Sequence, residues 1–182
     1  MLRRFFYKLY ITPRQWMHVL RWTVYALLLL LTIMVQTVMI GRHTVFGAHP
    51  DFVSVVIVCV CLREGAARGG LFALLASLFW FLTGADTGSV SIFVLTALPV
   101  CASLVCRAYL TQRYLPCLLT CLVTLFVNHT AIFLIKLYLG RATAVMFLTR
   151  LLPCVFVSLI AQPIVYFLAS RIEKIGEPYE SA

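Results

Sequence analysis

The chain has few charged residues, and acidic residues are the scarcest among them. Only 12% of its 182 residues are charged, with 6 Asp and Glu against 15 Lys and Arg. A soluble domain carries about twice that charged fraction. Hydrophobic residues make up 63% of the chain. Because so little polar surface is available to face water, the composition excludes a soluble globule and predicts an integral membrane protein of one domain.

The sequence also lacks the motifs on which catalysis usually depends. No Gly-x-Ser-x-Gly motif supplies a nucleophile, no Gly-rich phosphate loop is present, and the expected membrane spans contain no carboxylate. In a helix, the thiols of Cys59 and Cys61 point to different faces, and no His or carboxylate pairs with them. We therefore expect the seven cysteines to act as small apolar residues. The expectation is a protein that is not an enzyme and has no catalytic residue, metal or cofactor.

Six apolar runs predict an all-α bundle of six transmembrane helices. A basic, aromatic head at residues 1–21 precedes a membrane domain at 22–169, and a cytoplasmic tail follows at 170–182. The expected spans are 22–41, 51–62, 70–83, 89–106, 114–135 and 143–169. The second run is so short that tilting or shielding by neighbours is expected. A five-span arrangement is the alternative, because the region around Arg141 fits the six-span pattern least well.

The basic residues are distributed unevenly between the two ends of these spans. Eleven Lys and Arg fall on the side of the N-terminus and three on the other side, with Arg150 unassigned. Since the side richer in Lys and Arg faces the cytoplasm, both termini are predicted to lie inside. The residues expected at the inner membrane surface are Arg3, Arg4, Lys8, Arg14, Arg21, Arg63 and Arg68.

A few polar side chains interrupt the apolar runs. Asn128 and His129 lie well inside the fifth span, where they predict either a polar clamp or cavity lining between helices, or a single hydrogen bond to a neighbouring backbone. Arg150 lies in the last span, where it is expected either to reach the headgroups or to remain as a buried cation. Asp51 and Asp86 fall at span ends, where we expect solvent to reach them.

Small residues recur at spacings of four in the centre of the chain. Gly69, Ala73 and Ser77 form one such series, and Ala76, Gly84 and Gly88 form another, with Trp80 in the gap. Such a stripe lets membrane helices approach each other closely. We expect it to bind the helix of a partner protein through Gly69, Ala73, Ser77, Trp80, Gly84 and Gly88.

The stretch 50–88 resembles the family of the rod-shape-determining membrane protein MreD. The resemblance lies in Pro50-Asp51 before a short apolar span, in Arg63-Glu64-Gly65 after it, and in the stepped small residues that end at Gly88. Where the family has an acid, this chain has Trp80. The length, the number of spans and the basic head also fit the family.

The resemblance implies a role without catalysis in the bacterial inner membrane. MreD-like proteins are scaffolds of the cell-elongation machinery, which builds peptidoglycan and maintains the rod shape. They bind the single-span protein MreC and act beside MreB, RodA and a class B penicillin-binding protein. The family's fold resembles that of the substrate-binding subunits of energy-coupling-factor vitamin transporters, so a vitamin-binding subunit is the alternative.

Overall fold

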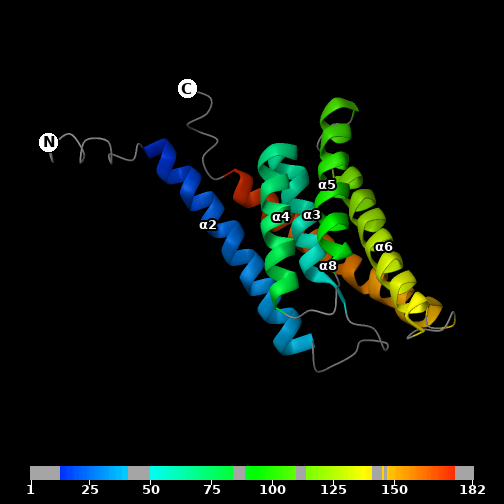
Figure 1. Cartoon of the computed structure of the whole chain (residues 1–182). Helices are drawn as coiled ribbons and strands as arrows, with labels where there is room; N and C mark the ends of the chain where they lie inside the picture. The colour runs from blue at the N-terminus through cyan, green and yellow to red at the C-terminus, as the bar shows by residue number, and fades with distance from the viewer. Residues whose placement is uncertain are drawn as a thin grey trace, which may run out of the picture.

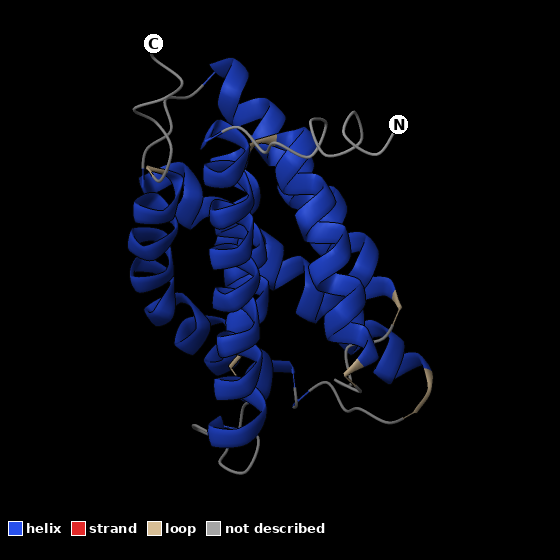
Figure 2. Cartoon of the chain, turned by 90° about the vertical axis from the view of Figure 1, so that its left-hand side faces the viewer, coloured by secondary structure: helices blue, strands red, loops and turns tan. Residues whose placement is uncertain are grey.

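The computed structural model describes residues 13–40, 50–83, 89–109, 114–140, 145 and 147–174. In these ranges the chain forms six α-helices, two short π-helical stretches and no strand (Figures 1 and 2). The helices are α2 (Pro13–Met34, continued by the π-helical η1, Val35–Ile40), α3 (Phe52–Glu64), α4 (Ala66–Leu82), α5 (Val90–Tyr109), α6 (Tyr114–Tyr138) and α8 (Leu152–Glu173, preceded by the π-helical η2, Phe147–Leu151). The predicted all-α architecture of six helices is confirmed.

Three of the helices have the length and the apolar composition needed to cross a membrane. These segments are Gln15–Val38, Tyr114–Tyr138 and Leu152–Glu173, and two shorter apolar helices, Ala66–Leu82 and Val90–Cys106, accompany them. This composition is compatible with a multi-pass membrane protein. Membrane insertion, the number of spans and the N-in orientation stay predictions.

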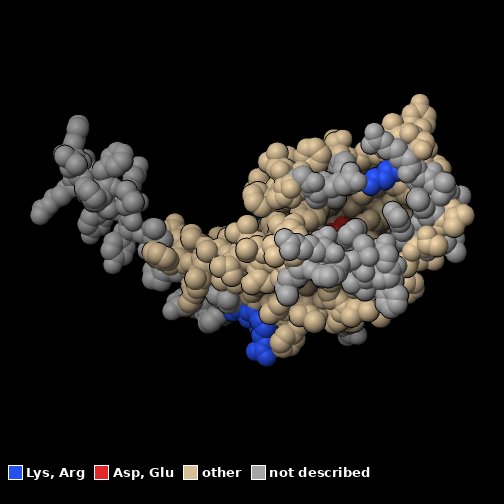
Figure 3. All heavy atoms as spheres, turned by 90° about the horizontal axis from the view of Figure 1, so that it is seen from below, with Lys and Arg blue, Asp and Glu red and all other residues tan. Residues whose placement is uncertain are grey.

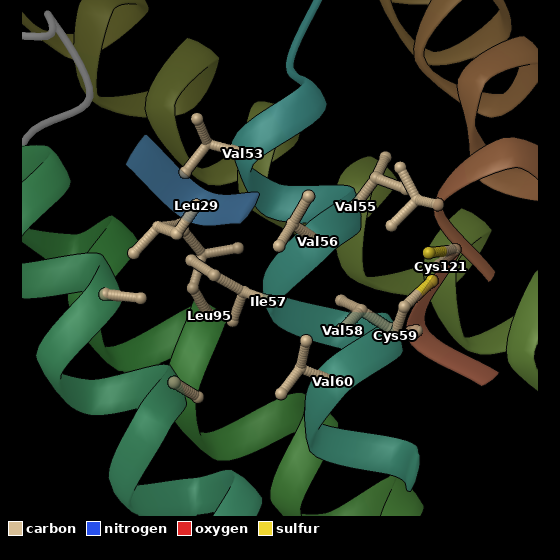
Figure 4. Close-up of a cluster of buried hydrophobic side chains, with 14 of the residues drawn as sticks. Leu29, Val53, Val55, Val56, Ile57, Val58, Cys59, Val60, Leu95 and Cys121 are labelled. Carbon is tan, nitrogen blue, oxygen red and sulfur yellow. The ribbon is translucent and has the colours of Figure 1, made fainter. Parts of the chain in front are cut away.

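Helix α3 lies at the centre of the bundle. It contacts α2, α4, α5, α6 and α8, and eleven of its thirteen residues are buried. Its apolar side chains point in all directions, toward Leu29 of α2, Leu95 of α5 and Cys121 of α6 (Figure 4). Thirteen residues extend only about 20 Å, against a hydrocarbon layer of about 30 Å. The expected shielding of this short run by its neighbours is therefore confirmed. A helix that is apolar on every side is stable when other helices or lipid cover all of its faces.

The helix boundaries differ from the sequence prediction at both ends of the chain. Helix α2 begins at Pro13, so residues 13–21 belong to the same helix as the first expected span rather than to a separate head. Proline is favourable in a first helical turn, and no helix breaker follows it before Met34. Helix α8 continues to Glu173, four residues beyond the predicted end of the last span. Residues 1–12 and 175–182 lie outside the described residues.

A single residue, Gly65, connects α3 to α4. Its φ of 86° lies in the left-handed region, which favours glycine, and its N–H donates to the carbonyl of Cys61 at 2.9 Å. One turn later, Gly69 lies directly against the backbone of Cys61, where an added Cβ would come within 2.6 Å of Cα and O. The two central helices therefore pack with their backbones in contact.

Candidate functional site

The predicted partner-binding stripe is buried inside the chain's own bundle. Ala73, Ser77 and Trp80 of α4 are almost completely buried, as is Gly69 against α3. Because α4 packs on both α3 and α5, these four residues join helices of this chain. Their assignment to a partner's helix is therefore corrected, since a stripe of small residues predicts close packing but does not identify the helix that approaches. Gly84 and Gly88 lie outside the described residues.

Two of the predicted membrane-surface residues form ion pairs within the bundle. Arg21 of α2 donates to both carboxylate oxygens of Glu64, with Nε 2.7 Å from Oε1. Arg63 donates to Oε2 of Glu173 at 2.8 Å, and its guanidinium lies 4.5 Å from the centre of the Tyr166 ring. We call these five residues the ion-pair cluster. It ties α2, α3 and α8 together at the end where α3 terminates.

The ion-pair cluster corrects two expectations from the sequence. Arg21 and Arg63 are largely buried against carboxylates, rather than extended to the membrane surface. Helix α3 extends two residues beyond the expected end of its span at Leu62, so it includes Glu64, a buried carboxylate, where no carboxylate was expected in a spanning helix. Arg68 is exposed, as expected for a residue at the surface. Arg3, Arg4, Lys8 and the side chain of Arg14 lie outside the described residues.

The opposite end of α3 holds a second polar group around Asp51. Asp51 is the N-cap of α3: Oδ1 accepts the N–H of Ser54 at 3.1 Å, and Oδ2 accepts the Ser54 hydroxyl at 2.5 Å. Its own N–H donates to Oγ of Ser158 on α8 at 2.8 Å. The expectation that solvent reaches Asp51 is wrong, because only 4% of the residue is exposed. Its position directly before an apolar run and three residues before Ser54 is the signal that could have identified the cap.

Helix α2 contributes to the same cap from its π-helical end. Oε1 of Gln36 accepts the N–H groups of Phe52 and Val53, at 3.0 and 3.1 Å. The first N–H groups of a helix have no partner within the helix, and a buried helix has little water to replace it. Gln36, Asp51 and Ser158 thus satisfy the buried start of α3 from three elements.

His129 of α6 connects this group to α8. Its Nε2 lies 3.7 Å from Oδ2 of Asp51 and 3.4 Å from Sγ of Cys154. The residue for which a polar clamp was one of the predicted roles therefore lies between α3 and α8, beside one carboxylate and one thiol. We call Asp51, Ser54, His129, Cys154 and Ser158 the Asp51 cluster.

Other polar side chains in the interior have no hydrogen-bond partner among the described residues. Both amide atoms of Asn128 and of Gln162 are in this state, and so is the hydroxyl of Thr124. All three side chains are essentially fully buried. Such groups are uncommon, because an unpaired polar group in an apolar interior is unfavourable. The clamp role of Asn128 stays a prediction, and the side chain of Arg150 lies outside the described residues.

The described cysteines are all free thiols. Sγ of Cys59 lies 3.6 Å from Sγ of Cys117 on α6, whereas the thiol of Cys61 lies beside Ser103 of α5. The prediction that these two neighbouring thiols face different helices is confirmed. No group of three metal-ligating side chains that could hold an ion occurs in the described part of the chain.

Comparisons with known proteins give no family for this chain. No family model matches it, and neither a curated protein nor a solved structure shows significant similarity to it. The loops that the vitamin-binding alternative would use, 42–49 and 84–88, lie outside the described residues.

Proposed function

We propose that the protein is a scaffold without catalytic activity in the bacterial inner membrane. It would serve the cell-elongation machinery as MreD-like proteins do and bind a single-span, MreC-like protein through its transmembrane faces. Through that partner it would act beside MreB, RodA and a class B penicillin-binding protein. The sequence pattern from Pro50 to Gly65 supports this proposal, because these residues begin and end the central helix of the bundle.

The observation that carries the proposal is the two-sided character of α4. One face of α4 packs on α3 and α5, and the opposite face exposes a row of large apolar side chains. Four leucines lie along this row at helical spacing: Leu71, Leu75, Leu78 and Leu82. We call them the α4 leucine row. This row, rather than the buried small residues, is where we place the partner's helix.

A membrane helix needs little more than a complementary apolar surface to pack on such a row. In lipid, helices associate by van der Waals contact and occasional hydrogen bonds, because burial of apolar surface gives no net advantage over lipid contact. Binding of a partner helix to the row therefore depends on the shape of the leucine side chains. Shortening these side chains removes contacts with a partner without preventing membrane insertion. This property makes the proposal testable with conservative substitutions.

The test replaces Leu71 and Leu75 together with alanine and measures recovery of an MreC-like single-span protein in mild detergent. We expect a several-fold lower recovery, because the partner's helix loses contacts on the row. The matched control replaces Leu115 and Leu119 of α6, which have the same spacing and exposed fractions of 72% and 61%, against 64% and 56% for the α4 pair. Equal loss in both variants would remove α4 as the docking face. Absence of such a partner from preparations of the unmodified protein would overturn the scaffold proposal itself.

A further inference from the structure

The end of the bundle where α3 begins is hollowed. Seen from this end, acidic atoms lie recessed at the floor of the hollow, and a basic residue stands at its rim (Figure 3). Among the described carboxylates, Glu64 and Glu173 belong to the ion-pair cluster at the other end, and Asp51 lies at this one. The Asp51 side chain is 6% exposed, so it is recessed but not sealed.

The hydrogen-bond donors to the Asp51 carboxylate come from Ser54, and no arginine or lysine contacts it among the described residues. Oδ1 and Oδ2 accept from the N–H and hydroxyl of Ser54, both of which are neutral donors. The nearest described basic group is His129, whose Nε2 lies 3.7 Å from Oδ2. No Lys or Arg forms an ion pair with Asp51 among the described residues, in contrast to Glu64 and Glu173, which are both paired with arginine.

Helical geometry directs the unpartnered Asn128 toward this carboxylate. Asn128 follows Cys117 by eleven residues, about three turns, so the two share one face of α6. That face looks at α3, because Cys117 contacts Cys59. Helices α3 and α6 run in opposite directions, since Cys59 meets the start of α6 and Asp51 lies beside His129. Asn128 is therefore on the α3-facing side at the level of Asp51, with a buried carbonyl and a buried NH₂ that lack partners.

A cation stands farther out on the same helix. Lys136 follows His129 by seven residues, about two turns, so it lies on the same face of α6 and about 10 Å farther along its axis. The hollow thus offers a carboxylate and an amide at depth, and an ammonium group nearer to its mouth. This arrangement suits a ligand that carries a positive and a negative group close together.

We propose that the hollow binds a small zwitterion that carries a primary ammonium group next to a phosphate. The ammonium donates hydrogen bonds to Oδ2 of Asp51 and to the amide oxygen of Asn128, and the phosphate pairs with Lys136. The same chemistry is present in free phosphoethanolamine and in the headgroup of phosphatidylethanolamine. This inference does not depend on the scaffold proposal, because Asp51, Asn128 and Lys136 do not belong to α4 or to its leucine row.

The experiment measures the melting temperature of the full chain in nanodiscs of phosphatidylcholine, with and without ligand. One arm adds soluble phosphoethanolamine, and the other replaces a part of the lipid with phosphatidylethanolamine. Phosphocholine and phosphatidylcholine are the controls, because their quaternary ammonium has the same charge but no N–H to donate. We expect the melting temperature to rise with the ethanolamine compound and not with its choline analogue. A rise in the soluble arm identifies a free solute as the ligand, and a rise confined to the lipid arm identifies the headgroup.

Variants then test whether this stabilisation arises in the hollow. Asp51→Asn removes the charge but keeps a good N-cap residue, and Asn128→Leu removes the unpartnered amide. We expect each to weaken binding at least tenfold. The matched control is Gln162→Leu, which removes another buried unpartnered amide, one turn beyond Ser158 toward the ion-pair cluster, and should bind within twofold of the unmodified protein. The proposal is overturned if neither ethanolamine compound stabilises the unmodified chain, or if Asp51→Asn and Asn128→Leu both bind as tightly as it does.

Discussion

At the scale of single residues, the polar groups of this chain are organised by contacts between distant segments. Glu64 pairs with Arg21, which is 43 residues away, and Asp51 donates its N–H to Ser158, which is 107 residues away. The local sequence correctly indicates that a helix starts at Asp51 and ends close to Gly65. It does not show which carboxylates are buried, because their partners come from other helices. The sequence thus predicted the positions of the polar residues but not the pairs that they form.

The Arg21–Glu64 pair leads to a prediction about stability. Glu64→Ala leaves Arg21 with its largely buried charge unpaired, and we expect a loss of about 3 kcal/mol in the free energy of unfolding. The double variant Arg21→Met, Glu64→Leu removes both charges and fills the space with apolar atoms, so it should lose much less than the single variant. The free energy of unfolding of the single and the double variant is measured in mixed micelles that contain increasing amounts of a denaturing detergent.

The exposed Arg68→Ala serves as the control for general effects of removing a cation near this end, and it should unfold like the unmodified chain. If the double variant were as unstable as Glu64→Ala, the loss would come from packing rather than from an unpaired charge. That result would contradict the role assigned to the ion-pair cluster.

At the scale of helices, the run lengths in the sequence predicted the six elements well. The runs are bounded by charged or Gly-rich stretches, and a helix in an apolar environment continues until such a boundary. The small-residue stripe also predicted close helix packing correctly. Its partner was assigned wrongly, because Gly69, Ala73 and Ser77 would look the same in sequence whether α3 or another protein covered them. Only the one-residue connection at Gly65, which folds α4 directly back on α3, decides between these two possibilities.

Two adjacent glycines provide a matched test of this packing. At Gly69, an added Cβ meets the backbone of Cys61 at 2.6 Å, whereas at Gly70 it meets only the side chain of Val100, at 2.8 Å. A backbone contact requires that the two helices separate, but a side chain can rotate away. We therefore expect Gly69→Ala to lower the free energy of unfolding by about 1–3 kcal/mol. Gly70→Ala should be close to neutral, because the better helix propensity of alanine, up to about 1 kcal/mol, offsets the smaller clash. Detergent-unfolding curves of the two variants check this order, and equal losses would contradict the contact between α3 and α4.

At the scale of the whole molecule, the two ends of α3 differ in chemistry. One end carries the ion-pair cluster, and the other carries the Asp51 cluster and the hollow (Figure 3). The apolar residues 55–62 of α3 lie between them (Figure 4). The composition alone indicated a membrane protein, because the fractions of charged and hydrophobic residues are the same however the chain folds. The Asp51 cluster was not predicted, because its members come from the start of α3, from α6 and from α8, which are distant in the sequence.

The distribution of basic residues predicts which end faces the cytoplasm. With eleven Lys and Arg on the side of the N-terminus and three on the other, the ion-pair end should lie inside and the hollow should open outside. A green fluorescent protein fused after residue 182 should therefore be fluorescent, and alkaline phosphatase fused after Thr83, at the end of α4, should be active. An active phosphatase after residue 182 would contradict this orientation. The result also bears on the ligand, because an outward hollow draws its zwitterion from the outer leaflet or the medium, whereas an inward one would draw it from the cytoplasm.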